Sequence, residues 1–485
     1  MVEHHHHHRV IIVGAGLSGI GLGAALRRVD IEDFVIVERQ RSVGGVWFDH
    51  EYPGCQCDIP GHLYSFSFAP SPDWTRLFPK QAEILEYLRK VTVEQGLESH
   101  LRLGSEVLRC NWNEDARCWH VTTSSGEMTC DALISAVGLT SVPISPDIPG
   151  IDTFDGERFH SARWNWDYDL AGTRVAVIGT GPSAVQIVPE IQPQVKQLTV
   201  FQRTPVWILP HFDRPISARQ QRALRRFPVL MRLYRIAMFL AWEAGAVASR
   251  GRLKMLEPMQ AFARKHLARQ VPDPALRAAL TPDHLIGCKR PIFSSRFYPA
   301  LMQDNVELVT NGIDHVEERA IVTKDGSRYE VDAIITASGY RIVRSILEDR
   351  IFGVGGTSLE QAWGGAPRAY KGTTVPGFPN FFILLGPNSV LGSAFVTLEA
   401  QTKYVVSALR HMNRQQIKRV EIRRGPLRRY VTKTDRDSEG TVWLSGCNNP
   451  YRDENGKNFV VFPGSAVQFQ RALRKFDAEA YDIAR

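Results

Sequence analysis

The sequence predicts an α/β fold with two Rossmann-like dinucleotide-binding domains and a helical insertion. Two stretches support this prediction, residues 10–19 and 174–184, because in each an apolar strand leads into a glycine turn and then a helix. Small residues in such a turn let the backbone approach a pyrophosphate, and the helix N-terminus offers it free N–H groups. Two such cradles in one chain imply two nucleotide cofactors that meet. The cradle residues are Gly14, Gly16 and Gly19 in the first stretch and Gly179, Thr180, Gly181 and Ser183 in the second.

The composition is that of an ordinary globular protein. The 485 residues are 44% hydrophobic and 23% charged. A formal net charge of +8 suits anionic cofactors and is too small to indicate nucleic-acid binding. We set aside the five histidines at residues 4–8 as an expression tag and expect the first strand to begin directly after them. This leaves no room for a secretory signal, so we expect a cytoplasmic protein.

The seven cysteines are scattered, and their spacing indicates neither a metal site nor a disulfide framework. The only close pair is Cys55 and Cys57, separated by Gln56. A reducing cytosol also disfavours structural disulfides. We therefore expect neither a bound metal nor a structural disulfide.

The residue that follows the second strand of the first domain selects its nucleotide. Strand 34–37 ends at Glu38, at the distance from Gly14 where a ribose-binding acid is expected. A carboxylate accepts hydrogen bonds from an unmodified ribose but repels a 2′-phosphate. Two like charges about 4 Å apart cost about 4 kcal/mol at an effective dielectric constant of about 20. This cradle therefore favours FAD or NAD over NADP.

The second cradle, at residues 174–184, prefers the opposite kind of nucleotide, one with a 2′-phosphate. Its second strand, residues 198–201, is followed by Arg203 and Thr204. A guanidinium at this position matches a 2′-phosphate. Ala184 replaces the third glycine of the fingerprint, which the motif permits. FAD in the first domain and NADPH in the second is the economical assignment.

The remaining pattern supplies the other elements of both domains. Apolar residues at helical spacing predict an amphipathic helix at 81–95, and Ser125-Gly126 predicts a turn between two strands. We expect strands at 118–123, 128–135, 306–309, 320–324, 334–337 and 381–385, and a helix at 397–411.

Two further motifs indicate a family. The loop at residues 44–58 reads GGVWFDHEYPGCQCD, and a second segment reads Phe154-x-Gly156-x-x-x-His160-x-x-x-Trp164. The loop resembles the [AG]GxWxxxx[FY]P[GM]xxxD motif of type I Baeyer–Villiger monooxygenases at every defined position. The second segment resembles their FxGxxxHxxxW(P/D) fingerprint, except that Asn165 stands where Pro or Asp is usual. The resemblance covers nearly the whole chain.

The resemblance implies how the chain is divided and what it does. Residues 1–145 and 376–485 would form a split FAD-binding domain, and residues 146–375 an NADP-binding domain with a helical insertion at about 213–285. Flavin reduced by NADPH and exposed to oxygen would form a C4a-peroxyflavin, whose anion attacks a ketone and yields an ester or lactone. A permanently charged arginine favours that anion.

The resemblance also implies roles for single residues. It places the catalytic arginine at Arg290, with Asp58 orienting it, and gives His160 a structural role. Trp443 lies in a variant of the family's late SWxxGxN loop. The implied FAD neighbours are Glu38, Gly45, Val46, Trp47, Asp58, Tyr64 and Val107, and the implied NADPH neighbours are Arg203, Thr204, Lys289 and Trp443.

Three alternatives stay open. In one, Arg290 only holds a phosphate beside Lys289, as basic pairs commonly do. In another, the same cofactors serve a heteroatom-oxygenating or hydroxylating relative. In the third, Cys55 and Cys57 serve a flavin disulfide reductase, although such enzymes have a CxxxxC pair and a CxC pair has a different reach.

The insertion offers two further possibilities. Ser217 and Gln220 have the spacing of a capping box, and the helices that follow are basic on one side. Residues 236–248 are apolar apart from Glu243 but too short to span a bilayer. They suit either a lid over an apolar substrate or a helix resting on a membrane surface. We favour the lid, because the insertion interrupts the nucleotide domain beside its site. The expected partners are then a hydrophobic ketone and molecular oxygen.

Overall fold

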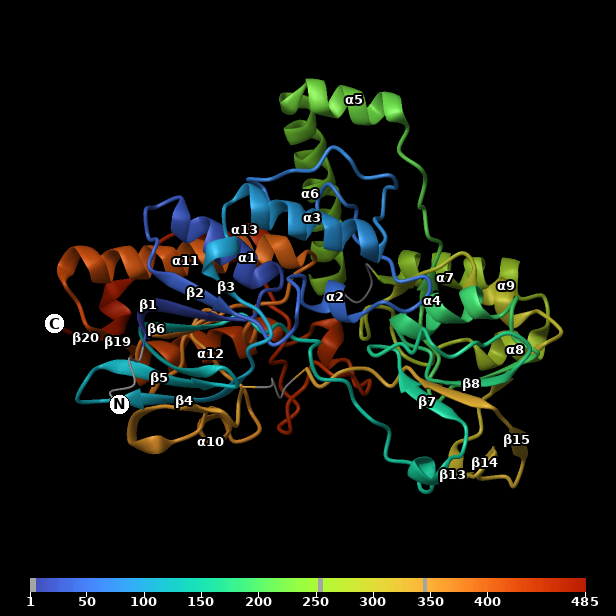
Figure 1. Cartoon of the computed structure of the whole chain (residues 1–485). Coiled ribbons are helices and arrows are strands. Elements are labelled where there is room, and N and C mark those ends of the chain that lie inside the picture. Colours follow the sequence, from blue (N-terminus) through green and yellow to red (C-terminus); the bar gives the residue numbers. More distant parts are fainter. Residues whose placement is uncertain (1–5, 252–255, 343–346) are drawn as a thin grey trace.

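Two α/β units, the first with a mixed sheet and the second with a parallel one, lie side by side in the computed structural model (Figure 1). The model describes residues 6–251, 256–342 and 347–485, without the side chains of 245–251. The first unit is built on an eight-stranded sheet of order β17-β4-β5-β6-β1-β2-β3, with β18 also paired to β6. Helices α1 (Leu17–Arg27), α3 (Gln81–Glu94) and α11 (Ala394–Gln415) cover one face. The strands are β1 (His6–Val13), β2 (Phe34–Val37), β3 (Leu101–Arg102), β4 (Val107–Asn113), β5 (Cys118–Thr123), β6 (Gly126–Ser135), β17 (Ile351–Phe352) and β18 (Phe381–Ile383).

The second unit has a five-stranded, fully parallel sheet of order β12-β9-β8-β16-β7. Its strands are β7 (Glu157–His160), β8 (Arg174–Ile178), β9 (Gln197–Phe201), β12 (Val306–Val309) and β16 (Ala333–Thr336). Helices α4 (Pro182–Ile191) and α9 (Phe297–Leu301) pack on it, and a small antiparallel sheet adjoins it, made of β13 (Ile313–Glu317), β14 (Ala320–Thr323) and β15 (Arg328–Glu330). The predicted α/β class with two Rossmann-like sheets is confirmed.

The insertion is helical, as predicted. It contains α5 (Ala218–Arg226), α6 (Pro228–Gly251), α7 (Glu257–Gln270) and α8 (Pro274–Ala279). The predicted capping box is present, since Ser217 accepts from the Gln220 backbone N–H and the Gln220 side chain accepts from the Ser217 N–H. Two short strands, β10 (Ile208–Leu209) and β11 (Ile292–Phe293), pair where the insertion leaves and rejoins the unit. Among the described residues, no helix is long and apolar enough to cross a membrane.

Two predicted boundaries differ from the structure. The first strand begins within the histidine run, where His6, His7 and His8 pair with Met128, Thr129 and Cys130 of β6. Strand β6 is ten residues long, and its residues 128–130 lie beyond the part that pairs with Val10–Val13. Their backbone groups therefore pair with the histidines that precede Arg9. In addition, β17 pairs with β4, so the chain returns to the first sheet before the predicted position 376. A two-residue strand has no periodicity to find in a sequence.

Asn380 ties the two parts of the first unit together. Its side chain is buried, and its Nδ2 donates to the carbonyl oxygens of Asp131 and Lys418, each at 2.8 Å. Its Oδ1 accepts from the N–H of Val420 at 2.8 Å. The Asn380 backbone has φ = 54°, a left-handed conformation that asparagine tolerates better than most residues.

We predict that Asn380→Ala lowers the free energy of unfolding by about 3–4 kcal/mol. The change removes one hydrogen bond from a buried N–H and two to part-buried carbonyl oxygens, and it places alanine at positive φ. Asn380→Gly removes the same hydrogen bonds but suits the backbone, so its loss should be smaller by about 1 kcal/mol. Urea denaturation of both variants measures this order, and a wild-type midpoint for Asn380→Ala would contradict it.

Candidate active site

The first cradle joins β1 to α1 and leaves no room for side chains. Gly14 has φ = 108°, and a Cβ there would lie 2.8 Å from the carbonyl oxygen of Ala136. A Cβ on Gly19 would lie 1.9 Å from the Gly14 carbonyl oxygen. Gly16 is the N-cap of α1, and in the described chain no side chain caps that helix. Its first N–H groups therefore suit the pyrophosphate of a dinucleotide.

Glu38 lies buried at the end of β2, beside this cradle. Its Oε2 accepts from the Ala15 N–H at 2.7 Å and its Oε1 from the Gln40 N–H at 2.9 Å. Burial raises the pKa of Glu38, and these two N–H groups oppose that shift. A carboxylate has about four acceptor sites, so two remain for ribose hydroxyls. Val107 is buried near this point, two residues after Ser105, whose N–H donates to the Glu38 carbonyl oxygen at 2.9 Å.

The second cradle joins β8 to α4 in the same way. Gly179 has φ = 115°, and a Cβ there would lie 2.6 Å from the Ala337 carbonyl oxygen. A Cβ on Gly181 would meet no atom of the described chain within 4 Å, so the space in front of it is open. The Thr180 hydroxyl donates to the Thr204 carbonyl oxygen at 3.3 Å and links the turn to the segment after β9.

Two cations converge beside this second cradle. Burial lowers the pKa of Lys289, and repulsion from nearby Arg203 lowers it further. Attraction to Asp283 raises it in part. These residues come from segments on opposite sides of the insertion. Like charges held this close are stabilised by an anion between them, and the 2′-phosphate of NADPH has that charge.

The loop at residues 44–58 contacts the first cradle at its beginning. The Gly44 N–H donates to the Ala15 carbonyl oxygen at 3.0 Å. Gly45 has φ = 56°, and a Cβ there would lie 2.9 Å from the Cα of Gly16. Val46 and Trp47 follow in α2 (Val46–Asp49), and the Trp47 Nε1 donates to the Tyr64 hydroxyl at 3.1 Å. The predicted flavin neighbours Gly45, Val46, Trp47 and Tyr64 thus lie together beside the first cradle.

The same loop contacts the second cradle further along. The Tyr52 hydroxyl donates to Gln186 Oε1 of α4 at 3.0 Å, and Gln186 Nε2 donates to the Gln56 carbonyl oxygen at 2.9 Å. A Cβ on Gly54 would lie 2.7 Å from the Gln186 carbonyl oxygen. Gln186 could not be found from the sequence, because a single glutamine on a helix has no motif to mark it.

His50 and Tyr340 add a second contact between the units that sequence reasoning missed. Their rings stack with centroids 5.0 Å apart, and burial lowers the pKa of His50 to about 4, so the ring is neutral at physiological pH. His160 packs edge-on against the same Tyr340 at 5.7 Å, and its Nδ1 accepts from the Ala162 N–H. Ser183, in the first turn of α4, lies near the Tyr340 hydroxyl. The contacts of His160 fit a structural role.

Asn165, the one departure from the fingerprint, has a local explanation. Its Oδ1 accepts from the Asp167 N–H at 3.0 Å, which an aspartate could also do. Its Nδ2 donates to Glu157 Oε1 of β7 at 2.8 Å, which an aspartate could not do. The asparagine therefore keeps the turn and adds a hydrogen bond to the sheet.

Asp58 and Arg290, predicted as the catalytic pair, lie in contact. Arg290 Nη2 donates to Asp58 Oδ1 in an ion pair. Asp58 raises the pKa of Arg290 more than burial lowers it, so the guanidinium stays charged. The Arg290 side chain is 54% exposed, and its outer face is open to a reactant. Tyr451, which no motif marked, lies beside it and feels its charge.

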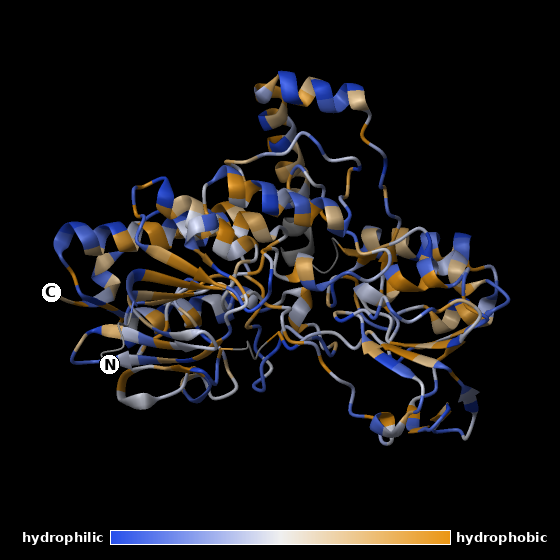
Figure 2. Cartoon of the chain, viewed as in Figure 1, coloured by the Kyte–Doolittle hydropathy of each residue, from blue (hydrophilic) through white to orange (hydrophobic). Residues whose placement is uncertain are grey.

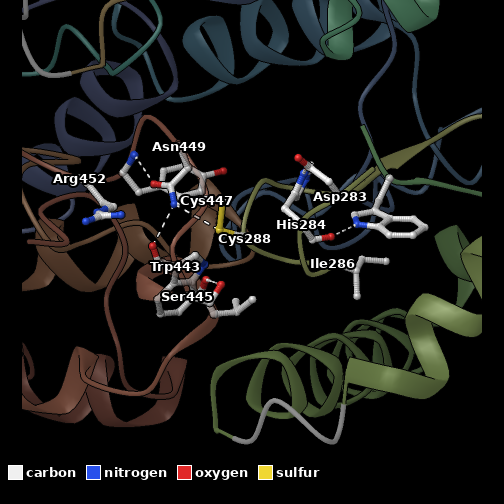
Figure 3. The surroundings of a disulfide bond; sticks show 12 residues. Asp283, His284, Ile286, Cys288, Trp443, Ser445, Cys447, Asn449 and Arg452 are labelled. Carbon is white, nitrogen blue, oxygen red and sulfur yellow. Dashed lines mark hydrogen bonds and ion pairs between the residues drawn. A yellow bond between two sulfur atoms is a disulfide. The ribbon is translucent and has the colours of Figure 1, made fainter. Parts of the chain in front are cut away.

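The expectation of no structural disulfide is wrong, because Cys288 and Cys447 are bonded (Figure 3). The two cysteines are 159 residues apart, so no spacing rule relates them, and only the fold brings their segments together. The bond fixes the chain two residues before Arg290 to the segment that contains Trp443. Trp443 is buried in the same apolar cluster as Cys288, and its carbonyl oxygen accepts from Asn449 Nδ2 at 2.9 Å.

Cys55 and Cys57 are free and buried, and burial is the main cause of their raised pKa values, which for Cys55 is about 12. A thiol that does not ionise is a poor nucleophile. These two cysteines therefore do not favour disulfide reduction.

The fold and its two cradles define an oxidoreductase of the kind that brings two dinucleotides together. Residues 11–229 match the family model described as pyridine nucleotide-disulphide oxidoreductase. A Baeyer–Villiger monooxygenase of Streptomyces coelicolor is 43% identical to this chain, over 98% of it and 92% of that protein. One of Pseudomonas aeruginosa is 41% identical, over 98% and 91%. The chain therefore belongs to the Baeyer–Villiger monooxygenase family, as the two motifs predicted.

Solved structures agree. The chain resembles OTEMO in complex with FAD and NADP, with a TM-score of 0.88 and 28% identity over 98% of this chain and 99% of that one. It also resembles ε-caprolactone-bound cyclohexanone monooxygenase, with a TM-score of 0.86 and 26% identity over 99% and 100%. The fold of two dinucleotide domains with a helical insertion is thus shared by enzymes of this family.

We predict five titratable thiols in the denatured, unreduced protein and seven after reduction, because Cys288 and Cys447 are bonded and the other cysteines are free. Reduction should also lower stability by about 2–4 kcal/mol, since a cross-link restricts the unfolded chain. Thiol titration with and without reductant measures the first effect and thermal unfolding the second. In Cys447→Ala the two titrations should agree, whereas in the control Cys118→Ala they should still differ by two. Seven thiols without reductant would contradict the disulfide.

Proposed function

We propose that this chain is an FAD-dependent monooxygenase that uses NADPH and molecular oxygen to insert one oxygen atom beside a carbonyl carbon, converting a ketone into an ester or lactone. The observation that supports this most directly is the Asp58–Arg290 ion pair, placed at the end of the loop that contacts both cradles. The relatives named Baeyer–Villiger monooxygenase and the lactone-bound structure favour the same reaction.

In this proposal each group of residues has a separate task. The first cradle, Glu38 and the beginning of the 44–58 loop hold FAD, which when bound and reduced supplies the activated oxygen. Arg290 lies where it can stabilise negative charge on the attacking oxygen and on the carbonyl oxygen of the substrate. Arg290 does not give up its proton at physiological pH, so it does not protonate the attacking oxygen, which stays a nucleophile. Asp58 fixes the direction of the guanidinium.

The second cradle, with Arg203, Thr204 and Lys289, holds NADPH by its phosphates. Trp443 lies in the segment bonded to Cys288, so the same cross-link positions it and Arg290. We propose that nucleotide retained in this cradle, with Trp443 beside it, excludes water from the reacting atoms.

The substrate class and the compartment are part of the same proposal. A hydrophobic ketone is the proposed substrate class, since the relatives are named Baeyer–Villiger monooxygenases and one similar structure holds ε-caprolactone. We also propose a cytoplasmic enzyme, because NADPH is its reductant. A disulfide in that compartment is usually transient or redox-sensing, so the Cys288–Cys447 bond would then be reversible.

We predict that Arg290→Ala lowers the rate of ester formation by at least about a hundredfold, because a preorganised charge at the developing oxyanion is lost. The variant should still bind FAD and oxidise NADPH, since both cradles are intact. Product analysis by mass, with a cyclic ketone and an aryl alkyl sulfide in parallel, tests the function as well. The control Arg296→Ala removes a comparably exposed ion pair, with Glu190, and should keep activity. If Arg290→Ala forms as much ester as the wild type, this residue has no role in the mechanism. If the wild type oxygenates the sulfide and not the ketone, the heteroatom-oxygenating alternative is favoured.

We predict that Arg203→Ala raises the KM for NADPH by about tenfold to a hundredfold and leaves the KM for NADH unchanged. A hydrogen bond between charged groups contributes about 1.5–3 kcal/mol, and only NADPH has the 2′-phosphate that makes it. Steady-state kinetics with both nucleotides measures the difference. Arg319→Ala, an exposed arginine before β14, is the control and should change neither value. An equal rise for NADH and NADPH would argue against the assignment of Arg203.

A further inference from the structure

The hairpin of α5 and α6 exposes an unusual amount of apolar surface. Sixteen large hydrophobic residues are exposed in the described part of the chain, and six of them lie between residues 227 and 240. Their exposed fractions range from 45% to 66%. The hairpin projects from the rest of the molecule, at the top in Figures 1 and 2. We call these six residues the apolar patch: Phe227, Val229, Leu230, Leu233, Ile236 and Leu240.

Four of the six patch residues form one face of α6. Val229, Leu233, Ile236 and Leu240 follow one another at intervals of four, three and four, which places their side chains in a single stripe along the helix. A different face of α6 is held by the first unit. There Phe239 and Trp242 pack against its core, and Arg235 Nη1 donates to the His62 carbonyl oxygen at 2.7 Å. The exposed apolar stripe is therefore separate from the face of α6 that packs against the core.

The hairpin is anchored near its tip as well. Gln221 Nε2 donates to the Trp74 carbonyl oxygen at 3.0 Å, and Arg225 forms an ion pair with Asp73. The segment before α5 is held too, since the Ile216 N–H donates to the Thr75 carbonyl oxygen at 2.8 Å. The patch is thus presented on a fixed support.

The charge of the hairpin segment itself has one sign, although Arg225 is paired with Asp73 of the first unit. Residues 214–242 contain seven arginines and no acidic residue. Six of the seven are exposed: Arg214, Arg219, Arg222, Arg225, Arg226 and Arg232. A surface that combines exposed apolar side chains with a rim of arginines fits a partner that is apolar inside and negatively charged outside.

We propose that the α5–α6 hairpin docks on an anionic lipid bilayer, with the apolar patch inserted at the headgroup boundary and the arginines among the lipid phosphates. A second copy of the chain fits less well, because pairing two such faces brings like charges together. A lipid bilayer can also accept a projecting helix without offering a complementary groove, which a protein partner would have to provide. The enzyme would then take its substrate from the membrane surface, which goes beyond the reaction proposed above and does not depend on it.

Vesicle sedimentation of the full-length protein tests this proposal. We expect binding to phosphatidylcholine vesicles that contain phosphatidylglycerol, weaker binding at high salt, and little binding to phosphatidylcholine alone. Each arginine near such a surface contributes about fivefold in affinity. Arg226→Glu with Arg232→Glu should therefore reduce binding at least about twentyfold, whereas Arg428→Glu with Arg429→Glu on α12 (Arg424–Ser438) should not.

Apolar substitutions give the second arm. Leu233→Gln with Leu240→Gln should reduce vesicle binding at least about tenfold and leave NADPH oxidation unchanged, since both side chains are exposed on the hairpin. Leu103→Gln with Leu108→Gln, which are similarly exposed on the first unit, is the matched control. Two results would overturn the proposal: wild-type protein that stays in the supernatant with both kinds of vesicle, or binding that the patch variants do not change. A concentration-dependent dimer that Leu233→Gln with Leu240→Gln dissociates, measured by light scattering, would assign the patch to a second copy and also overturn it.

Discussion

The close packing of the 44–58 loop against both cradles is the constraint on which the rest of the site depends. At one end of the loop, a Cβ on Gly45 would lie 2.9 Å from the Cα of Gly16. Further on, a Cβ on Gly54 would lie 2.7 Å from the carbonyl oxygen of Gln186. Both glycines have positive φ, so other residues would meet strain as well as contact. The loop thereby fixes the spacing of two sites that belong to different sheets, and cofactors in them can react only if that spacing is right.

Arg290 is held from two directions by parts of the chain that are remote in sequence. Asp58, at the end of the same loop, pairs with its guanidinium, and two residues before it Cys288 is bonded to Cys447. The insertion separates Arg290 from the cradle of its own unit, so local structure alone would leave it poorly placed. A side chain that must meet developing charge within a fraction of an ångström needs such support. The disulfide and the ion pair restrict the backbone and the side chain respectively.

The features that could be predicted from the sequence are those with local causes. A glycine turn between a strand and a helix, an acid at the end of the next strand and a capping box at Ser217 each depend on residues close together in the chain, and the structure contains them all. Features that depend on distant pairing were missed. The Cys288–Cys447 bond, the two-residue β17 and the contact of Gln186 with the loop exist only once the fold has formed. The pairing of His6 with Met128 has a different cause, because strand pairing uses backbone groups and a run of histidines has no side-chain pattern that predicts it.

The two cradles have the same backbone but different electrostatics, and the difference suits different tasks. Glu38 is buried and already bound to two N–H groups of its own cradle, so it is screened little by salt and its geometry is fixed before a nucleotide arrives. Arg203 is exposed and Lys289 beside it is half-buried, so these two cations are reached by an incoming phosphate and attract it from solution. A buried, preorganised acceptor favours a cofactor that stays, and cations that solvent reaches, one exposed and one half-buried, favour a cofactor that exchanges. In an enzyme that consumes one NADPH per turnover but keeps its flavin, the second cradle must release what the first must retain.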